Sequence, residues 1–302
     1  MTTIVTVASG KQGVGKSVLV SNLGILLARE GRRVVLVDLD IGRANLHTHF
    51  GIFEPILTLT DFLSHRVSAL KDIAQTIGWG TGLRLIPGMG ATPPSINFSY
   101  AQQQRLLRHL RYIDADIIIL DCAPGITFQA LDVFLLGDHQ LVVANPDPAS
   151  VIELYRFLKL AAIRKMIKCI AGGESEDESP SLMEQEFETL QQIVEASKGL
   201  GPLNQSGAEE ALREFQPLFV LNRTTAETKM SITYLQRVIA KFIGSELVAL
   251  GEIPQNEAVG QSVRVFQPVV DLAPKSSAAK AFIHIMYALL QRMQTREQVP
   301  VP

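Results

Sequence analysis

Near its amino terminus the chain reads IVTVASGKQGVGKS over residues 4–17, a β-branched apolar run followed by a glycine-rich loop. The residues after it have the apolar spacing of a helix, which we expect to span about 16–30. A strand, a loop of the form G-x-x-x-x-G-K-S/T and a helix, in this order, are the context of a phosphate-binding Walker A loop. The glycines let successive backbone N–H groups turn toward phosphate oxygens, and the positive end of the helix points at the same place.

The candidate nucleotide-binding residues of this segment follow from that arrangement. Lys16 is expected to neutralise the β- and γ-phosphates and to act in catalysis, and the Ser17 hydroxyl to ligate Mg²⁺. A plain glycine turn is the structural alternative, and Lys-Ser at this spacing makes it a minor one. The full set is Gly10, Gln12, Gly13, Val14, Gly15, Lys16, Ser17 and Val18.

Elsewhere, short apolar runs alternate with longer helical patterns. Such alternation predicts an α/β fold, a doubly wound and mainly parallel sheet of about seven or eight strands that binds its ligand at the carboxyl ends of the strands. The helices expected in the gaps span 100–112 and 149–168. Besides 4–8, the expected strands span 33–38, 83–87, 117–121, 140–144, 218–222 and 247–253.

We expect residues 1–302 to form a single domain, since 47% of the side chains are hydrophobic and the pattern is continuous. One polar segment, about 171–214, breaks the rhythm and is read as an insertion that contains a helix at about 182–197. A last helix is expected at about 277–295. Apolar residues fill most of its circumference, which suits docking on the sheet better than lying in a lipid interface.

Charge and cysteine content exclude several classes of protein. The formal net charge of −2 gives no general reason to bind nucleic acid or an anionic membrane. Cys122 and Cys169 suggest neither a disulfide framework nor a zinc site, and both are expected to be buried.

His47 and His49 are read as surface residues. Without a signal peptide pattern or a long apolar stretch, the chain is expected to be cytoplasmic.

Carboxylates follow two of the expected strands. Asp38 and Asp40 come at the end of 33–38, and Asp121 ends the apolar strand 117–121 in a Walker B arrangement. Asp121 is therefore expected to hold Mg²⁺ through water, and Gly125 to respond to the γ-phosphate. Taken alone, Asp38 and Asp40 are better explained as turn and cap residues.

The loop and the strand-end carboxylates together resemble the MinD/ParA superfamily, whose deviant Walker A loop carries a second lysine. The resemblance implies that Lys11 acts in catalysis by reaching the partner's nucleotide in an ATP-dependent homodimer; otherwise Lys11 is a solvated loop residue. The chain has Gln12 where that family commonly has glycine. The resemblance also makes Asp40 the residue that orients the attacking water, with Asp38 near the Mg²⁺ and Asn45 in support.

The same resemblance implies ATP or ADP with Mg²⁺ as the ligand. Asn222, Arg223 and Pro254 match the adenine-pocket positions of the superfamily, and a clear guanine motif is absent. An asparagine at a strand end is otherwise a common turn residue.

Segments 85–88, 254–259 and 267–270 look most like the FlhG/FleN and MinD branch. FlhG/FleN proteins are ATPases that set flagellar number and position together with the GTPase FlhF. The resemblance thus implies a slow, partner-stimulated ATPase with a protein partner, for instance an FlhF-like GTPase, placed in the cytoplasm or at the inner face of the membrane. Weak ATP-dependent membrane attachment stays open.

Two alternatives remain. A ParA-like DNA-segregation ATPase needs a basic face, for which Arg105, Arg108 and Arg111 on one expected helix are the best candidates. Such arginines are more often a solvated face, so binding of nucleic acid is not expected. A metabolic P-loop enzyme needs a second substrate pocket, for which the sequence shows no motif.

Overall fold

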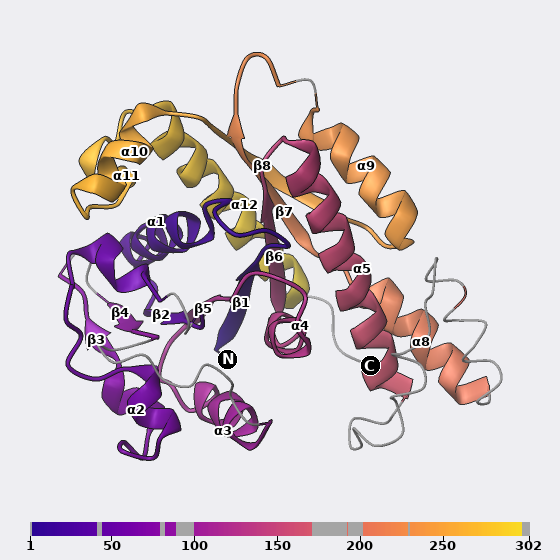
Figure 1. Cartoon of the computed structure of the whole chain (residues 1–302), viewed down its shortest axis with the longest axis horizontal. Helices are drawn as coiled ribbons and strands as arrows, with labels where there is room; N and C mark the ends of the chain where they lie inside the picture. The colour runs from indigo at the N-terminus through magenta and orange to yellow at the C-terminus, as the bar shows by residue number, and fades with distance from the viewer. Residues whose placement is uncertain are drawn as a thin grey trace.

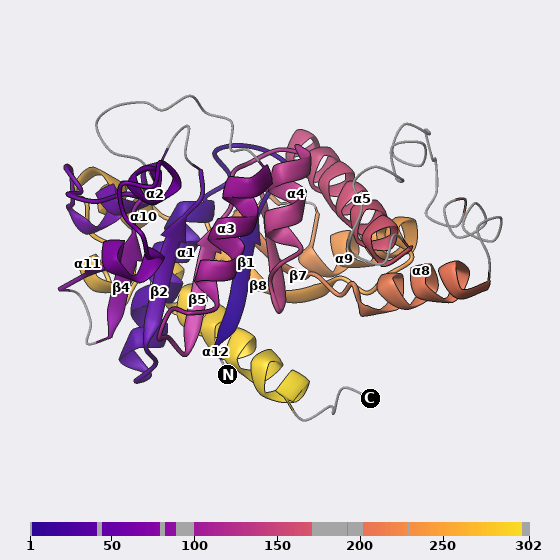
Figure 2. The same ribbon diagram turned by 90° about the horizontal axis from the view of Figure 1, so that it is seen from below.

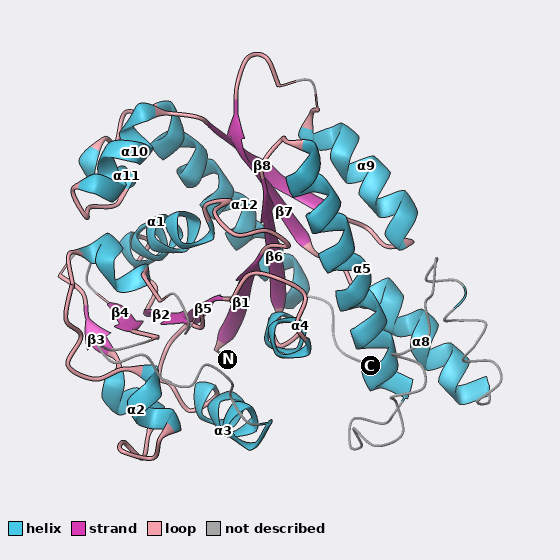
Figure 3. Ribbon diagram, in the orientation of Figure 1, coloured by secondary structure: helices cyan, strands magenta, loops and turns pink. Residues whose placement is uncertain are grey.

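The computed structural model describes residues 2–40, 44–78, 82–88, 100–170, 192, 202–228 and 230–297. Within them, one eight-stranded sheet has the order β3-β4-β2-β5-β1-β6-β7-β8 (Figures 1 and 3). Every neighbouring pair is parallel except β3 and β4, which are antiparallel. The predicted doubly wound, mainly parallel sheet is confirmed.

The strands expected from the sequence are all present, with ends that differ by at most two residues. They are β1 Thr3–Ala8, β2 Val34–Asp38, β4 Leu83–Ile86, β5 Ile117–Asp121, β6 His139–Ala144, β7 Leu218–Thr224 and β8 Val248–Pro254. The additional strand, β3 Gln75–Thr76, is too short to produce a sequence pattern.

The longer helices also agree with the expected ranges. The helices that were expected are α1 Lys16–Arg29, α3 Tyr100–Leu110, α5 Pro148–Ile170 and α12 Ser277–Glu297. The others are α2 Leu59–Leu63, α4 Phe128–Phe134, α8 Pro202–Glu214, α9 Ile232–Ile243, α10 Glu257–Arg264 and α11 Val269–Leu272, with 3-10 turns η2 Leu46–Phe50 and η3 Leu70–Ile73.

Alternate side chains of β1, β2, β5, β6 and β7 enter two separate cores. In β5, Ile118 and Leu120 join one core, which includes residues of α3, α4, α5 and α9. Ile117 and Ile119 join the other, which includes residues of α1, α11 and α12. The helices accordingly lie on both faces of the sheet, with α1 and α12 on one side and α4 and α5 on the other (Figures 1 and 2).

The polar segment 171–214 is partly described. Its last part, where no helix was expected, forms helix α8, which buries Ala208 and Ala211 and packs beside α5. Pro202 stands at the first helical position, where proline is tolerated because that N–H would have no helical partner. The helix expected at 182–197 lies outside the described residues except for Gln192.

Two expectations about single residues change. Cys122 is buried as expected, but Cys169 is exposed near the end of α5, so that expectation was wrong. Arg105, one of the candidates for a basic face, donates hydrogen bonds to the carbonyls of Phe62 and Val67, and its guanidinium lies 4.0 Å from the centre of the Phe62 ring. This arginine therefore packs α3 against α2.

Helix α12 is docked on the sheet, as its broad apolarity predicted. It packs against β8 and α1 and buries Phe282, Ile285, Met286 and Leu289. Among the described residues, no helix is long and apolar enough to cross a membrane.

Replacing Phe282 by alanine tests this docking. Phe282 is 1% exposed, and truncating a buried phenylalanine costs about 3–5 kcal/mol because contacts are lost and a cavity remains. We expect the free energy of unfolding, measured by urea denaturation, to fall by that amount. The exposed Lys280→Ala on the same helix should change it by less than about 0.5 kcal/mol; equal effects of the two variants would contradict the docked helix.

Candidate functional site

The Walker loop lies between β1 and α1, at the point where the order in which the strands are added to the sheet reverses. Strand β1 has β5 on one side and β6 on the other, and Val7 is in register with Asp121 of β5. Asp121 is in turn in register with Asp38 at the end of β2. Because parallel strands end at one edge of the sheet, the loop and the two carboxylates meet there, as predicted from the sequence.

Two glycines of the loop are required by close neighbours. A Cβ on Gly10 would lie 2.0 Å from the Glu153 carbonyl oxygen of α5, and one on Gly15 would lie 2.4 Å from the Asn222 side-chain nitrogen. Gly15 also has a φ of 98°, which glycine adopts without strain. The loop is thus pressed between α5 and the end of β7.

Two of the expected metal-binding residues, Ser17 and Asp121, lie in contact at the start of α1. The Ser17 hydroxyl donates a hydrogen bond of 2.6 Å to Asp121 Oδ2. Asp38 accepts hydrogen bonds from the backbone N–H groups of Asp40, at 3.1 Å, and Leu46, at 3.0 Å. Asp121 Oδ1 is buried and has no hydrogen-bond partner in the part of the chain that the structure describes.

The carboxylates of Asp38 and Asp121 are both buried and lie close enough for their charges to interact. Burial, and then the nearby charge of Asp121, raises the pKa of Asp38 to about 8. Burial raises the pKa of Asp121 to about 6, although the Lys16 charge and the Ser17 hydrogen bond act in the opposite direction. Carboxylate and hydroxyl oxygens are ligands that suit Mg²⁺, and a divalent cation would relieve the repulsion and satisfy the unpartnered oxygen. The residues present therefore fit this metal.

The two lysines of the loop differ in their surroundings. Lys16 is 7% exposed, and its charge acts on Asp121. The Lys11 side chain is 46% exposed, and its ammonium nitrogen lies 3.6 Å from Asp147 Oδ1 just before α5. One lysine is therefore inside the site and the other at its rim, and the roles expected for them stay predictions.

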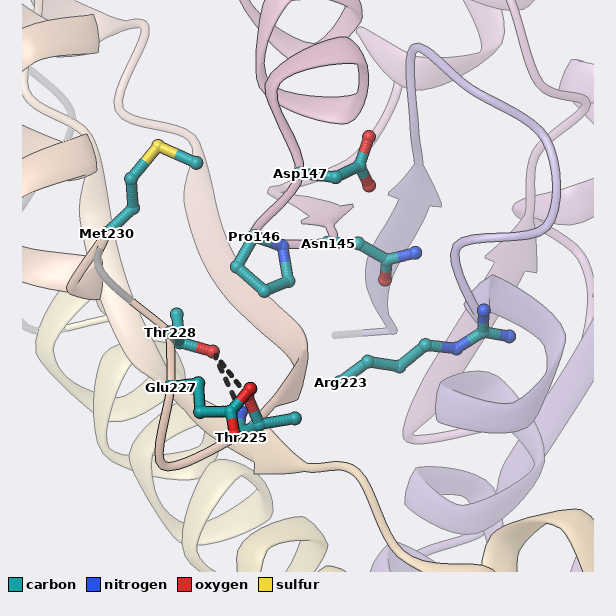
Figure 4. A pocket seen from close by; sticks show the side chains of 8 residues that line it. All are labelled: Asn145, Pro146, Asp147, Arg223, Thr225, Glu227, Thr228 and Met230. Carbon is teal, nitrogen blue, oxygen red and sulfur yellow. Dashed lines mark hydrogen bonds between the residues drawn. The ribbon is translucent and has the colours of Figure 1, made fainter.

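A pocket of about 550 Å³ opens beside the loop. Its walls come from the segment after β6 and the segment after β7, as Figure 4 shows. Among the described residues, Asn145 Oδ1 is buried without a hydrogen-bond partner in this wall. The lining residues are Asn145, Pro146, Asp147, Arg223, Thr225, Glu227, Thr228 and Met230.

The residues expected to hold the base are only partly in this pocket. Arg223 lines it and has a φ of 59°, a conformation that is strained for a residue other than glycine. The Asn222 side chain donates a 2.7 Å hydrogen bond to the Val14 carbonyl and accepts one from the Arg223 N–H, so it fixes the Walker loop. Pro254 ends β8 in register with Thr224 and is not among the lining residues.

The lining segment Asn145-Pro146-Asp147 was missed from the sequence. Its signal was available, since it follows the apolar strand β6, whose neighbour β1 carries the Walker loop. Polar residues at the carboxyl end of such a strand belong to the ligand-binding edge.

Gly125, which is expected to respond to the γ-phosphate, lies near the loop. The Gly125 N–H donates to the Ser9 carbonyl at 3.3 Å, so the segment after β5 touches the Walker loop. Asp40 is half-buried and follows Asp38, while residues 41–43 lie outside the described ranges; Asn45 is exposed and precedes η2.

The two histidines were expected at the surface, which is wrong for His47. His47 is 8% exposed and His49 is half-buried. The described residues contain no group of three or more His, Cys, Asp or Glu residues that could hold an ion.

Comparison with known proteins gives three kinds of match. Residues 5–269 match the model of the CobQ/CobB/MinD/ParA nucleotide binding domain. The chain is 26% identical over 281 residues to the antiactivator FleN of Pseudomonas aeruginosa, covering 92% of this chain and 83% of FleN. It is 32% identical over 294 residues to an uncharacterized ATP-binding protein of Methanocaldococcus jannaschii, covering 96% and 88%.

The fold is shared with solved structures. The septum site-determining protein MinD of Pyrococcus horikoshii, complexed with Mg-ADP, has a TM-score of 0.65 and 21% identity to this chain. The alignment covers 99% of this chain and 100% of that one.

The raised pKa values predict how stability depends on pH without a divalent cation. An unfolded aspartate loses its proton near pH 4, whereas folded Asp38 has a pKa of about 8. Between these values the folded state binds more protons, so this group makes the free energy of unfolding fall as the pH rises. We expect Asp38→Asn to remove this fall. Between about pH 5 and pH 8, the free energy of unfolding of the unmodified protein should drop by at least about 1 kcal/mol more than that of the variant.

Urea denaturation in the presence of a chelator measures this difference. Asp72→Asn, at an exposed position, serves as the control and should keep the original pH profile. Parallel profiles for Asp38→Asn and the unmodified protein would show that the Asp38 carboxyl group does not hold its proton.

Proposed function

Because the chain belongs to the CobQ/CobB/MinD/ParA family of nucleotide-binding domains, we propose that it is a switch ATPase that dimerises when it binds Mg-ATP. The observation that carries the proposal is the unpartnered carboxylate oxygen of Asp121, buried beside Ser17 and Lys16 at the Walker loop. A buried polar atom without a hydrogen-bond partner is costly, and such a cost is tolerated where a ligand supplies the missing contact.

Each residue of the site has a proposed task. Lys16 binds the β- and γ-phosphates, and the backbone N–H groups of the loop hold their oxygens. Ser17 and Asp121, with Asp38 behind them, hold Mg²⁺. When bound, this ion supplies positive charge near the transferring phosphoryl group. Asp40 orients the attacking water, and Gly125 follows the γ-phosphate because its segment already touches the loop at Ser9.

ATP is the proposed nucleotide. The pocket next to the loop is large enough for a base, and the Asn145 side chain offers it a free acceptor oxygen. The Arg223 guanidinium can stack on a purine. A relative described as ATP-binding and a MinD structure complexed with Mg-ADP support this choice over a guanine nucleotide.

Dimerisation is proposed to depend on Lys11. This side chain is half-exposed at the rim of the site and is paired with Asp147, which also lines the base pocket. Because Lys16 already serves the phosphates, Lys11 is available to leave Asp147 and to contact the nucleotide of a second copy.

The cellular role that fits best is that of an FlhG/FleN-like protein, which controls the number or position of flagella or of another polar structure. The match to FleN along 92% of the chain supports this choice. We propose slow hydrolysis stimulated by a partner protein, for instance an FlhF-like GTPase. Since α12 is docked on the sheet, a protein partner rather than this helix would bring the cytoplasmic protein to its place.

Lys16→Ala tests nucleotide binding. Removing a buried cation from the phosphates should weaken Mg-ATP binding at least about 100-fold, equivalent to about 2.7 kcal/mol. Titration calorimetry measures the affinity, and Lys11→Ala in the same loop is the matched control that should stay within about threefold. Unchanged affinity of the Lys16 variant would refute the proposed phosphate site.

Lys11→Ala tests the switch. With a non-hydrolysable ATP analogue and Mg²⁺, light scattering should show a dimer for the unmodified protein and a monomer for this variant, because the contact to the second nucleotide is missing. Asp147→Asn, which removes the ion pair and keeps Lys11, should still dimerise. A Lys11 variant that dimerises as well as the unmodified protein would exclude action across the dimer.

A further inference from the structure

A buried ion cluster joins helix α4 to helix α5. Asp132 of α4 has a side chain that is 8% exposed and receives two hydrogen bonds from Arg164 of α5, at 2.8 and 2.9 Å. The Lys168 ammonium lies 2.7 Å from the same carboxylate. Burial opposes ionisation of Asp132, but the hydrogen bonds from Arg164 and Lys168 outweigh it and lower its pKa. The contact is therefore a bidentate ion pair, whose two parallel hydrogen bonds fix the relative orientation of the two side chains.

Arg164 holds α4 at a second point. Its guanidinium carbon lies 5.5 Å from the centre of the Phe128 ring. Phe128 is the first residue of α4 and stays 57% exposed. Phe128 and Asp132 are four residues apart, so they lie on one face of the helix, and one guanidinium contacts both turns.

The carboxyl end of α4 makes further contacts besides the pair of Asp132 and Arg164. The Thr6 hydroxyl of β1 donates a 2.8 Å hydrogen bond to the Phe134 carbonyl, and the Phe134 and Phe157 rings stack edge to face at 4.9 Å. These contacts tie the carboxyl end of α4 to the sheet and to α5. Arg164 contacts α4 both at Asp132, near this end, and at Phe128, the amino-terminal residue of the helix.

That amino-terminal end is directly connected to the nucleotide site. Only residues 122–127 separate Asp121 from α4, and Gly125 within them touches the Walker loop at Ser9. Helix α5, which carries Arg164, meets the same loop at its own start, where the Glu153 carbonyl faces Gly10. Helices α4 and α5 lie side by side (Figures 1 and 2).

We propose that Arg164 and Asp132 form a latch that sets the position of residues 122–127 beside the Walker loop and so act as positioning residues for ATP hydrolysis. The latch rests on the proposed ATPase function. It acts through the segment between Asp121 and Phe128, and it leaves the phosphate-binding groups themselves untouched. A lysine at 164 would keep the charge but lose the two-point geometry and the stacking on Phe128.

The experiment compares ATP turnover and affinity in Arg164→Lys and in the unmodified protein. We expect kcat to fall about tenfold and the Kd for Mg-ATP to change less than threefold, because only the placement of the segment is altered. The double variant Asp132→Glu with Arg164→Lys restores the reach of the pair and should recover at least half of the lost kcat. The matched control is Arg156→Lys on the same helix, whose 2.8 Å pair with Glu153 is exposed, and it should keep its kcat.

Hydrogen exchange provides a readout independent of turnover. In Arg164→Lys the amides of 122–134 should exchange at least about tenfold faster, while those of α1 and α12 stay unchanged. Phe128→Leu, at an exposed position, should also speed amide exchange at 122–134, but by a smaller factor. This variant tests the latch if Arg164→Lys does not fold.

Unchanged kcat with unchanged exchange at 122–134 would overturn the latch, and so would faster exchange spread over the whole protein, which indicates a purely structural role. An unmodified protein that does not hydrolyse ATP would overturn the proposed function instead, and the exchange data would still decide on the latch.

Discussion

The repulsion between two buried carboxylates, Asp38 and Asp121, is the constraint around which the carboxyl edge of the sheet is built. Both are about 1% exposed and sit in register on neighbouring strands, so the sheet itself fixes how close they are. A charge buried in this way is tolerated only with partners. The structure supplies some of them: the Lys16 ammonium, the Ser17 hydroxyl and the N–H groups of Asp40 and Leu46. One Asp121 oxygen remains without a hydrogen-bond partner among the described residues, and a bound cation would supply the missing contact.

The residues at this edge could be predicted from the sequence because a parallel sheet brings the segments that follow its strands to the same edge. Apolar runs located β1, β2 and β5 to within one residue, and the chemistry-bearing residues stand directly after each run. Since the carboxyl ends of parallel strands share one edge, spacing along the chain brought Ser17 and Asp121 together, and the resemblance to the MinD/ParA superfamily added Asp38. The same rule applies to Asn145 after β6, which was missed because an Asn-Pro pair is also an ordinary turn.

Contacts between distant segments could not be predicted in this way. The resemblance to the MinD/ParA superfamily implied that Asn222 lies at the adenine pocket, and the structure adds that its amide holds the Val14 carbonyl, a partner 208 residues away in the sequence. His47 and helix α8 were misread for a related reason: each is polar or glycine-containing locally, and burial against α1 or α5 decides its environment. Such burial is a property of the packed fold and leaves little trace in a short window of sequence.

The same distinction separates the two lysines of the loop, which look alike in sequence. Lys16 opens α1 and is buried against the carboxylates, so moving it would leave Asp121 more costly to keep charged. Lys11 is the third residue after Ala8 and its side chain is half-exposed, and its partner Asp147 belongs to the wall of the base pocket. An exposed ion pair contributes little to stability and can be exchanged for another contact at small cost. Lys11 is therefore suited to change partners, and because Asp147 begins the stretch that leads into α5, such a change would reach the helix that also carries Arg164.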